Sequence, residues 1–302
     1  MRDYELHLKN MRDSGIEWVR MGVKRSVSQC EPVFRKAHAL DLKVIAVITS
    51  KNMLSGLDFK TKHYFPRSGW NEKWREAVQS IAKGLNQYVN IWQIDNELNH
   101  PWHNPLPWLN KGLALDIAEG GIEAVKGIDS EAKVSLNLFF KRKTLFPGIN
   151  FPRDRPLILK LKERLGDKID ILGMDIYRGT WHKGSPSDYP EDINYYHDLW
   201  EKDIMIMETG YCTGSLGHTP ETQASHVDEV FRCLDRNIRE SDWFLGMIWY
   251  EYVSKHEGIP CEEFFGLHES DGTTAKPAWE KFKEKVDHYE QYSKIFGTTY
   301  HY

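Results

Sequence analysis

The sequence lacks the features that mark several classes of protein. No apolar run approaches the roughly 20 residues that a membrane-spanning helix needs. The formal net charge is only -4, and it is not concentrated in any block. A nucleic-acid partner would require a basic face, so we expect neither a nucleic acid nor a membrane among the partners. The N-terminus, MRDYELHLKN, is charged and predicted to be helical, and it shows no secretory signal.

Cysteine is scarce, and the patterns of metal sites are missing. The four cysteines have no metal-like spacing: Cys30, Cys212, Cys233 and Cys261. We expect most of them to be free thiols, and a disulfide between Cys212 and Cys261 stays open because both follow predicted strand ends. His63, His100 and His103 form no HxH or HExxH pattern. The sequence therefore indicates neither a metal nor an organic cofactor.

Helical and strand patterns alternate along the whole chain, which is typical of a parallel sheet with crossover helices. Seven strands are predicted, over 17–23, 43–49, 90–94, 133–139, 169–177, 204–210 and 243–250. Eight helices are predicted, over 3–14, 31–40, 71–87, 108–126, 156–165, 189–202, 220–239 and 277–292. The length of 302 residues fits one barrel-sized domain over 1–302. We predict an α/β fold, a TIM (β/α)8 barrel.

A (β/α)8 barrel has eight strands, and the first of them is missing from the sequence. The first helix begins at residue 3, so no N-terminal segment fills the gap. One explanation is that the sequence begins after the true N-terminus and has lost the strand and any signal peptide. A cytoplasmic and a secreted location therefore both stay open. Alternatively, another chain supplies the strand, or the β-prone tail over 295–302 (IFGTTYHY) occupies the slot.

Two predicted strands end in a carboxylate. The stretch over 88–100, YVNIWQIDNELNH, reads as a buried strand that runs into Asp95, Asn96 and Glu97. The stretch over 204–210, IMIMETG, is a second buried strand, and it ends at Glu208. In an α/β barrel the carboxyl ends of the strands carry the chemistry. The alternative for the first stretch is that Asn96 and Glu97 cap the next helix.

Glu97 and Glu208 would end strands four and seven of such a barrel and face each other across its mouth. Two carboxylic acids that flank a glycosidic bond are what glycoside hydrolysis requires, because one protonates the leaving oxygen and the other attacks the anomeric carbon or activates water. A purely structural pair of buried acids is disfavoured, since buried carboxylates without partners are costly.

At these motifs the chain resembles the glycoside hydrolases of clan A. Asn96-Glu97 after the fourth strand and Glu208 after the seventh match the clan's signature. The WQIDNE stretch is similar to family 42 β-galactosidases, whereas ETGY is more similar to endo-galactanases and mannanases of the clan. FGLHESDGTTAKPAWEKF resembles an ending that is common in these enzymes. The family within the clan stays open.

The resemblance implies a retaining mechanism on a β-linked glycoside or polysaccharide. Glu97 would be the general acid/base and Glu208 the nucleophile, with Asn96 bonding the sugar hydroxyl next to the anomeric carbon. Strict alternation along a strand would send Asn96 and Glu97 to opposite faces. The strand end must therefore kink, or Asn96 must act from the rim.

The resemblance also implies three supporting residues. Arg20 would orient the nucleophile, Tyr177 would bond the same carboxylate, and Trp249 would form the aromatic floor under the reacting sugar. Each has a structural alternative. Arg20 can be a buried ion-pair partner, and Tyr177 and Trp249 can fill the core.

Aromatic residues make up 13% of the chain, with 11 Trp, and they either fill the core or offer flat platforms for sugar rings. Trp102, His103 and Trp181 lie in predicted loops on the catalytic side, where rim packing and substrate contact are both open. Asn137, on the 133–139 strand, is a weaker candidate for substrate binding.

The sequence thus predicts a retaining glycoside hydrolase that needs no metal or organic cofactor and takes a carbohydrate substrate. The rival interpretation is a non-catalytic carbohydrate-binding barrel that derives from a truncated glycosidase. Both carboxylates are present, which favours the enzyme. The sugar, the linkage, the choice between internal and terminal cleavage, and the oligomeric state do not follow from the sequence.

Overall fold

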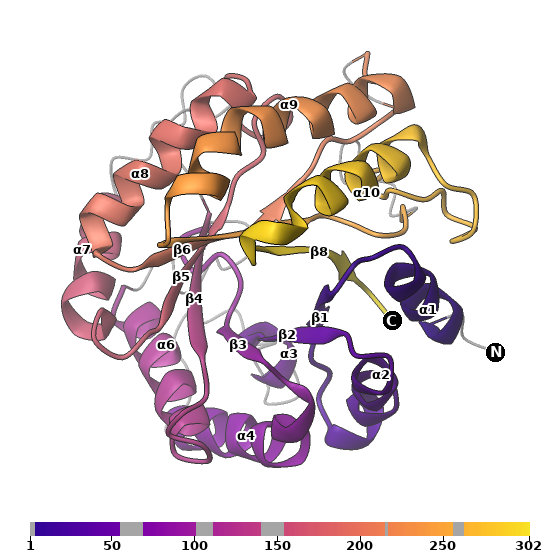
Figure 1. Ribbon diagram of the computed structural model, residues 1–302. Helices are drawn as coiled ribbons and strands as arrows, with labels where there is room; N and C mark the ends of the chain where they lie inside the picture. The colour runs from indigo at the N-terminus through magenta and orange to yellow at the C-terminus, as the bar shows by residue number, and fades with distance from the viewer. Residues whose placement is uncertain (1–3, 55–68, 101–110, 140–153, 215–216, 256–262) are drawn as a thin grey trace.

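The protein forms a closed barrel of eight parallel strands with helices packed around it (Figure 1). This computed structural model describes residues 4–54, 69–100, 111–139, 154–214, 217–255 and 263–302. The predicted TIM-barrel fold is confirmed. Within these ranges, none of the helices combines the length and the apolar character that crossing a membrane would require.

Apart from the pair β8 and β1, neighbouring strands in the barrel follow one another in chain order, and each such pair is joined by a crossover connection. The strands are β1 (Trp18–Gly22), β2 (Lys43–Ile48), β3 (Ile91–Ile94), β4 (Val134–Phe139), β5 (Ile171–Asp175), β6 (Asp203–Thr209), β7 (Phe244–Trp249) and β8 (Ile295–Tyr300). The first seven match the seven predicted strands to within a few residues at each end.

The helices of the outer layer are α1 (Tyr4–Asp13), α2 (Val27–Ala39), α3 (Ser50–Leu54), α4 (Trp70–Leu85), α6 (Lys111–Lys126), α7 (Asp154–Leu165), α8 (Tyr189–Trp200), α9 (Pro220–Glu240) and α10 (Pro277–Tyr289). The short helix α3 is not among the predicted helices. The Thr49 hydroxyl accepts a hydrogen bond from the Asn52 N–H (3.3 Å), which satisfies one of the exposed donors of its first turn.

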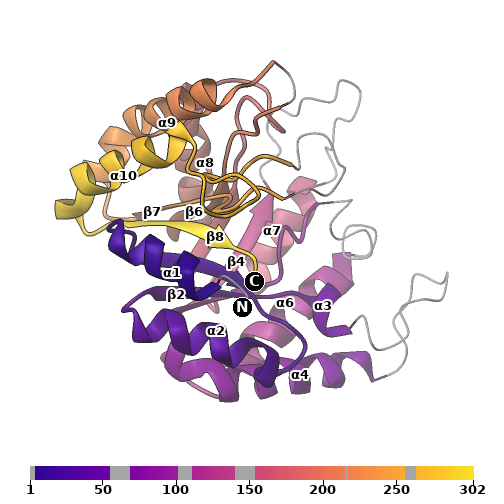
Figure 2. The same cartoon turned by 90° about the vertical axis from the view of Figure 1, so that its right-hand side faces the viewer.

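The C-terminal segment supplies the missing strand. β8 pairs in parallel with β7 on one side and with β1 on the other, in registers that place Trp249 beside Thr298 and Trp18 beside Gly297. In Figure 1 the yellow strand β8 lies next to the indigo strand β1, and Figure 2 shows the same neighbours from the side. The prediction that a first strand is absent is therefore corrected, and the tail explanation is confirmed. With eight strands in place the barrel exposes no sheet edge.

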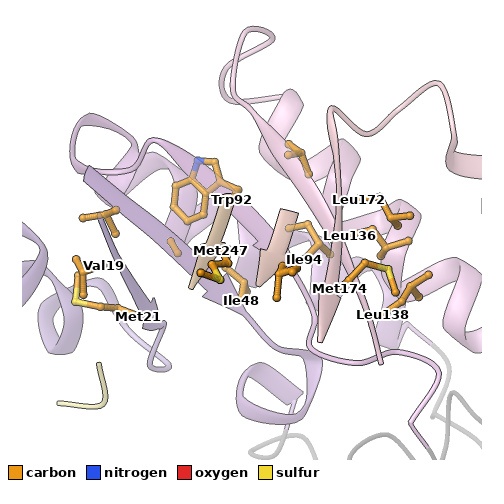
Figure 3. Close-up of a cluster of buried hydrophobic side chains, with 14 of the residues drawn as sticks. Val19, Met21, Ile48, Trp92, Ile94, Leu136, Leu138, Leu172, Met174 and Met247 are labelled. Atoms are coloured by element: carbon orange, nitrogen blue, oxygen red, sulfur yellow. The ribbon is translucent and has the colours of Figure 1, made fainter. Parts of the chain in front are cut away.

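Strand side chains alternate between an outer layer and the barrel interior. In β1, Val19 and Met21 belong to the main hydrophobic core under the helices, part of which is drawn in Figure 3. A separate small cluster fills the interior, and its six members come from five strands: Ile45, Ile91, Ile171, Met205, Met207 and Ile248. Arg20 lies beside Ile45 in the β1–β2 register, so it faces this interior. Polar groups therefore begin directly above an apolar floor.

The contact of β8 with β1 is too close for any side chain at Gly297. A Cβ atom built there would lie 2.2 Å from the Trp18 carbonyl oxygen, a backbone atom that cannot move without disturbing the strand pair. Gly22, at the end of β1, offers a matched comparison, because a Cβ atom at that position meets nothing within 4 Å.

We therefore expect Gly297→Ala to lower the free energy of unfolding by about 1–3 kcal/mol, the usual cost of overpacking a core. Gly22→Ala should change it by no more than about 0.5 kcal/mol. Urea unfolding of both variants measures the difference. Equal midpoints for the two variants would contradict the seating of β8 against β1.

Candidate active site

The chain kinks sharply where β3 ends. Asp95 and Glu97 both have left-handed backbone conformations, with φ of 57° and 48°, which residues other than glycine rarely adopt. The Ser50 hydroxyl donates to Asp95 Oδ2 (2.5 Å), and Asp95 Oδ1 accepts from the Asn96 N–H (2.8 Å). These bonds hold the kink in place. The kink breaks the alternation of side-chain directions along the strand, so Asn96 and Glu97 both reach the barrel interior.

Asn96 is tied to two inward-facing side chains. Its Oδ1 accepts from Arg20 Nη2 (2.7 Å) and from Gln93 Nε2 (3.1 Å). Gln93 is fixed in turn, because its Oε1 accepts from Arg20 Nε (2.8 Å) and its Nε2 donates to the Asp95 carbonyl oxygen (2.9 Å). The sequence analysis missed Gln93, although its place two residues after the inward-facing Ile91 would have indicated its direction.

A bulge in β6 turns Glu208 into the same space. Opposite β5, Met174 pairs with Ile206 and the next residue, Asp175, pairs with Glu208. One extra residue, Met207, is thus accommodated in β6, and such a bulge re-aims the side chains that follow it. Met207 lies in the interior cluster, and Glu208 follows it at the mouth with 8% of its surface exposed.

Two donors hold the Glu208 carboxylate. Arg20 Nη1 lies 2.6 Å from Oε1, and the Tyr177 hydroxyl donates to Oε2 (2.6 Å). Burial, followed by the negative charge of Glu208, raises the pKa of Tyr177 well above its usual value, so its hydroxyl stays a donor. Burial alone would lower the pKa of Arg20, but the charges of Glu208 and Asp175 outweigh burial and raise it. The structure therefore brings Arg20, Tyr177 and Glu208 together as predicted.

Glu97 and Glu208 face each other closely. One carboxylate oxygen from each lies within 4.8 Å of the other, and an oxygen of Asp175 lies within the same distance of both. Glu97 has only 2% of its surface exposed. Retaining glycosidases hold their two carboxyl groups roughly 5–5.5 Å apart, and inverting ones roughly 6.5–9.5 Å apart. An oxygen–oxygen distance within 4.8 Å is compatible with the shorter of these two separations.

Asn137 links Glu97 to a third acid. Its Oδ1 accepts from the Glu97 backbone N–H (2.8 Å), and its Nδ2 donates to Asp175 Oδ1 (2.8 Å). In this arrangement both ends of the Asn137 amide contact protein groups. Burial, and then the charges of Glu208 and Glu97, raise the pKa of Asp175 well above its usual range. The sequence analysis missed Asp175, although it ends a buried strand just as Glu97 and Glu208 do.

Trp249 lies on the wrong face to form a floor under a sugar. It is fully buried and packs against His226 of α9 and Phe282 of α10, with ring centroids 6.2 and 6.3 Å away. Ile248 before it points into the barrel, so alternation sends Trp249 outward and Tyr250 inward. Tyr250 contacts Tyr177 at 6.2 Å between ring centroids. Trp249 is therefore a core residue, which is the alternative that the sequence left open, and Tyr250 is the neighbouring aromatic side chain that faces the barrel interior.

The remaining predicted residues divide into two groups. Trp181 is half-buried and packs against a small cluster made of Phe139, Tyr177, Cys212 and Phe265. Trp102, His103 and Cys261 lie outside the described residues. Among the described residues, the three acids Glu97, Asp175 and Glu208 are the group whose oxygens are close enough together to hold a metal ion.

The fold and these side chains together define a parallel barrel with an acid pair at the carboxyl ends of β3 and β6. If β8 is counted first, these are the fourth and seventh strands. Solved structures with this fold align with nearly the whole chain. A family 1 β-glucosidase from Thermotoga maritima, solved in complex with isofagomine lactam, matches with a TM-score of 0.74 and 10% identity, over 95% of this chain and 87% of that one.

A hyperthermophilic β-glucosidase from Pyrococcus furiosus matches with a TM-score of 0.69 and 13% identity, over 97% of this chain and 86% of that one. A β-glucuronidase from Bacteroides uniformis, a calcium-binding mutant, matches with a TM-score of 0.66 and 13% identity, over 97% of this chain and 32% of that one. Neither a protein-family model nor a curated protein sequence matches the chain. The resemblance to the barrel glycosidases of clan A is thus confirmed at the level of the fold.

The side chains of Trp249 and Tyr250 point to opposite sides of the barrel wall, and this difference can be tested by replacing each of them. We expect Trp249→Ala to lower the free energy of unfolding by about 3–5 kcal/mol, because it leaves a large cavity under α9 and α10. Tyr250→Ala should lower it by no more than about 2 kcal/mol, since part of its ring is exposed. Guanidinium unfolding measures both values. A larger loss for Tyr250→Ala would reverse the two assignments.

Proposed function

We propose that the protein is a retaining glycoside hydrolase that cleaves a β-linked glycoside or polysaccharide by double displacement. The observation that carries the proposal is the pair of buried acids, Glu97 and Glu208, with oxygens within 4.8 Å of each other at the barrel mouth. Direct attack on the anomeric carbon requires this short spacing, whereas an inverting enzyme needs room for a water molecule between substrate and base. The shared fold with solved β-glycosidases supports the same class of reaction.

In the first step Glu208 attacks the anomeric carbon, and Glu97 gives its proton to the leaving oxygen. Arg20 and the Tyr177 hydroxyl each hold one oxygen of Glu208, which orients the carboxylate for attack. In the second step Glu97 takes a proton from water, and the water displaces Glu208 from the sugar. Each proton transfer contributes about 10²- to 10⁴-fold to the rate.

The residues around the pair would bind the sugar. The Asn96 amide, oriented by Arg20 and Gln93, would bond the hydroxyl next to the anomeric carbon. Tyr250, rather than Trp249, would offer the aromatic surface under the ring, and the half-buried Trp181 would border the same space. Amide, acid and aromatic groups arranged in this way suit the binding of a carbohydrate.

The two acids should respond differently to removal. Glu208→Ala should lower kcat by on the order of 10⁶-fold, as loss of a nucleophile does, because no glycosyl-enzyme intermediate forms. Glu97→Ala should keep activity on aryl glycosides with good leaving groups and lose about 10²- to 10⁴-fold on poor ones. Azide should restore the rate of Glu97→Ala and yield the β-glycosyl azide, because azide attacks the intermediate without a general base.

Turnover of a panel of aryl β-glycosides and NMR of the azide product measure these effects. The exposed Glu240 at the end of α9 provides the control variant Glu240→Ala, which should match the parent protein. A product of the opposite anomeric configuration from Glu97→Ala would reverse the roles of the two acids. Binding of sugars with no turnover of any glycoside would favour the non-catalytic carbohydrate-binding barrel instead.

A further inference from the structure

The group of acids at the barrel mouth contains one more acid than double displacement uses. Asp175 ends β5, lies beside Glu208 in the strand register and has none of its surface exposed. Its neighbours with charge are Glu97 beyond the end of β3, Glu208 on β6 and Arg20 on β1, and the Tyr177 hydroxyl belongs to the same group. If all three acids were ionised, Arg20 would leave two negative charges uncompensated in a buried site, which is costly.

The two oxygens of Asp175 differ in their surroundings. Oδ1 accepts from Asn137 Nδ2 (2.8 Å). Oδ2 is fully buried and, among the described residues, has no hydrogen-bond partner. A buried carboxylate oxygen without a donor is strongly disfavoured, whereas a protonated oxygen can itself donate to a neighbouring acceptor. Oxygens of Glu97 and Glu208 lie within 4.8 Å of an oxygen of the Asp175 carboxyl group, so these two acids are the candidate acceptors for that proton.

Glu208 is suited to carry the negative charge instead. It receives two hydrogen bonds, one of them from the Arg20 guanidinium, and donors of this kind favour the ionised form of a carboxylate. The hydrogen bond that Asp175 receives from Asn137 comes from a neutral amide. The direction of the Asp175 pKa, raised by burial and by the two neighbouring acids, agrees with this division.

We propose that Asp175 keeps its proton throughout the reaction and acts as a neutral hydrogen-bond donor beside the catalytic pair. It is a positioning residue, because its effect passes through Glu97 and Glu208. The catalytic part of this inference rests on the proposed function, and the protonation of Asp175 does not.

With Asp175 neutral, the net charge of the site is the same before and after the attack of Glu208. Before attack, the Glu208 carboxylate balances Arg20, while Glu97 and Asp175 are neutral acids. After attack, Glu208 is a neutral ester and Glu97, having given its proton to the leaving group, balances Arg20. If Asp175 were ionised, both states would carry an additional buried negative charge, and formation of the Glu97 carboxylate would be opposed by repulsion.

Asp175→Asn is the informative variant, because asparagine has nearly the same shape, can donate a hydrogen bond and is neutral at every pH. We expect Asp175→Asn to recover most of the activity that Asp175→Ala loses, and that loss should be about 10- to 100-fold, the usual effect of removing a buried hydrogen bond. The pH profile of kcat/KM should keep its alkaline limb in Asp175→Asn. If Asp175 were ionised in the parent protein, removing its charge would move that limb to lower pH, and the proposal would fail.

The protonation of Asp175 can also be measured without any substrate. Infrared difference spectroscopy of the parent protein against Asp175→Asn at neutral pH should show loss of a protonated-carboxyl C=O stretch. Loss of a carboxylate stretch instead would overturn the inference even if the enzyme hydrolyses glycosides. Conversely, the expected band without any glycoside turnover would leave the inference standing and count against the proposed function alone.

Two further measurements complete the test. If Asp175→Asn does not fold, NMR of the parent protein labelled with ¹³C at aspartate side chains replaces the infrared comparison. A buried carboxyl carbon with the shift of a neutral acid, unchanged across the neutral pH range, supports the proposal, and its absence contradicts it. Treatment with EDTA followed by addition of Ca²⁺ or Mn²⁺ tests a cation among the three acids. Activity lost to EDTA and restored by either ion would mean that Asp175 is an ionised ligand, contrary to the proposal.

Discussion

The buried ion pair between Arg20 and Glu208 is the interaction on which the rest of the site depends. Each nitrogen of the guanidinium contacts a different partner: Nε meets Gln93, Nη1 meets Glu208 and Nη2 meets Asn96. One planar group thereby fixes the relative positions of β1, β3 and β6. Removing a single member of a buried pair typically costs about 3–5 kcal/mol, because the other charge is left uncompensated. The position of the candidate nucleophile and the stability of the barrel are therefore coupled.

The barrel interior is divided into an apolar floor and a polar layer above it. The floor of isoleucine and methionine side chains excludes water from below, so each polar group in the layer above has to find its partner within the protein. Gln93, Asn137 and Tyr177 meet this requirement, since all three bridge between charged or backbone groups. Low local dielectric then strengthens every charge effect in the layer. In such surroundings the placement of one proton, as at Asp175, changes the energy of the whole cluster.

Much of the fold and the main acid pair could be predicted from the sequence, because buried parallel strands read as continuous apolar runs and a carboxylate at the end of such a run stands out. Other features of the site depend on local backbone geometry and on contacts between strands, and the pattern of apolar and polar residues does not contain this information. The bulge at Met207 and the kink at Asp95 are backbone events without a sequence signal, and the kink was expected only because Asn96 and Glu97 had to act together. Trp249 was considered for an aromatic floor although it packs outward into the core, since the direction of a side chain at a strand end cannot be fixed from the sequence alone. Asp175 was overlooked because its role depends on neighbours that come from other strands.

The closure of the barrel by β8 joins segments that lie far apart in the sequence. Thr299 pairs with Arg20, which lies almost the whole length of the chain away, so this contact has a very high sequence separation. Contacts of this kind slow folding, because a long loop must be closed before the pairing contributes any stability. Without β8 the barrel wall beside Arg20 would be open, because β8 is the strand that pairs with β1 on that side. The geometry of the candidate site therefore depends on a pairing between segments from opposite ends of the sequence.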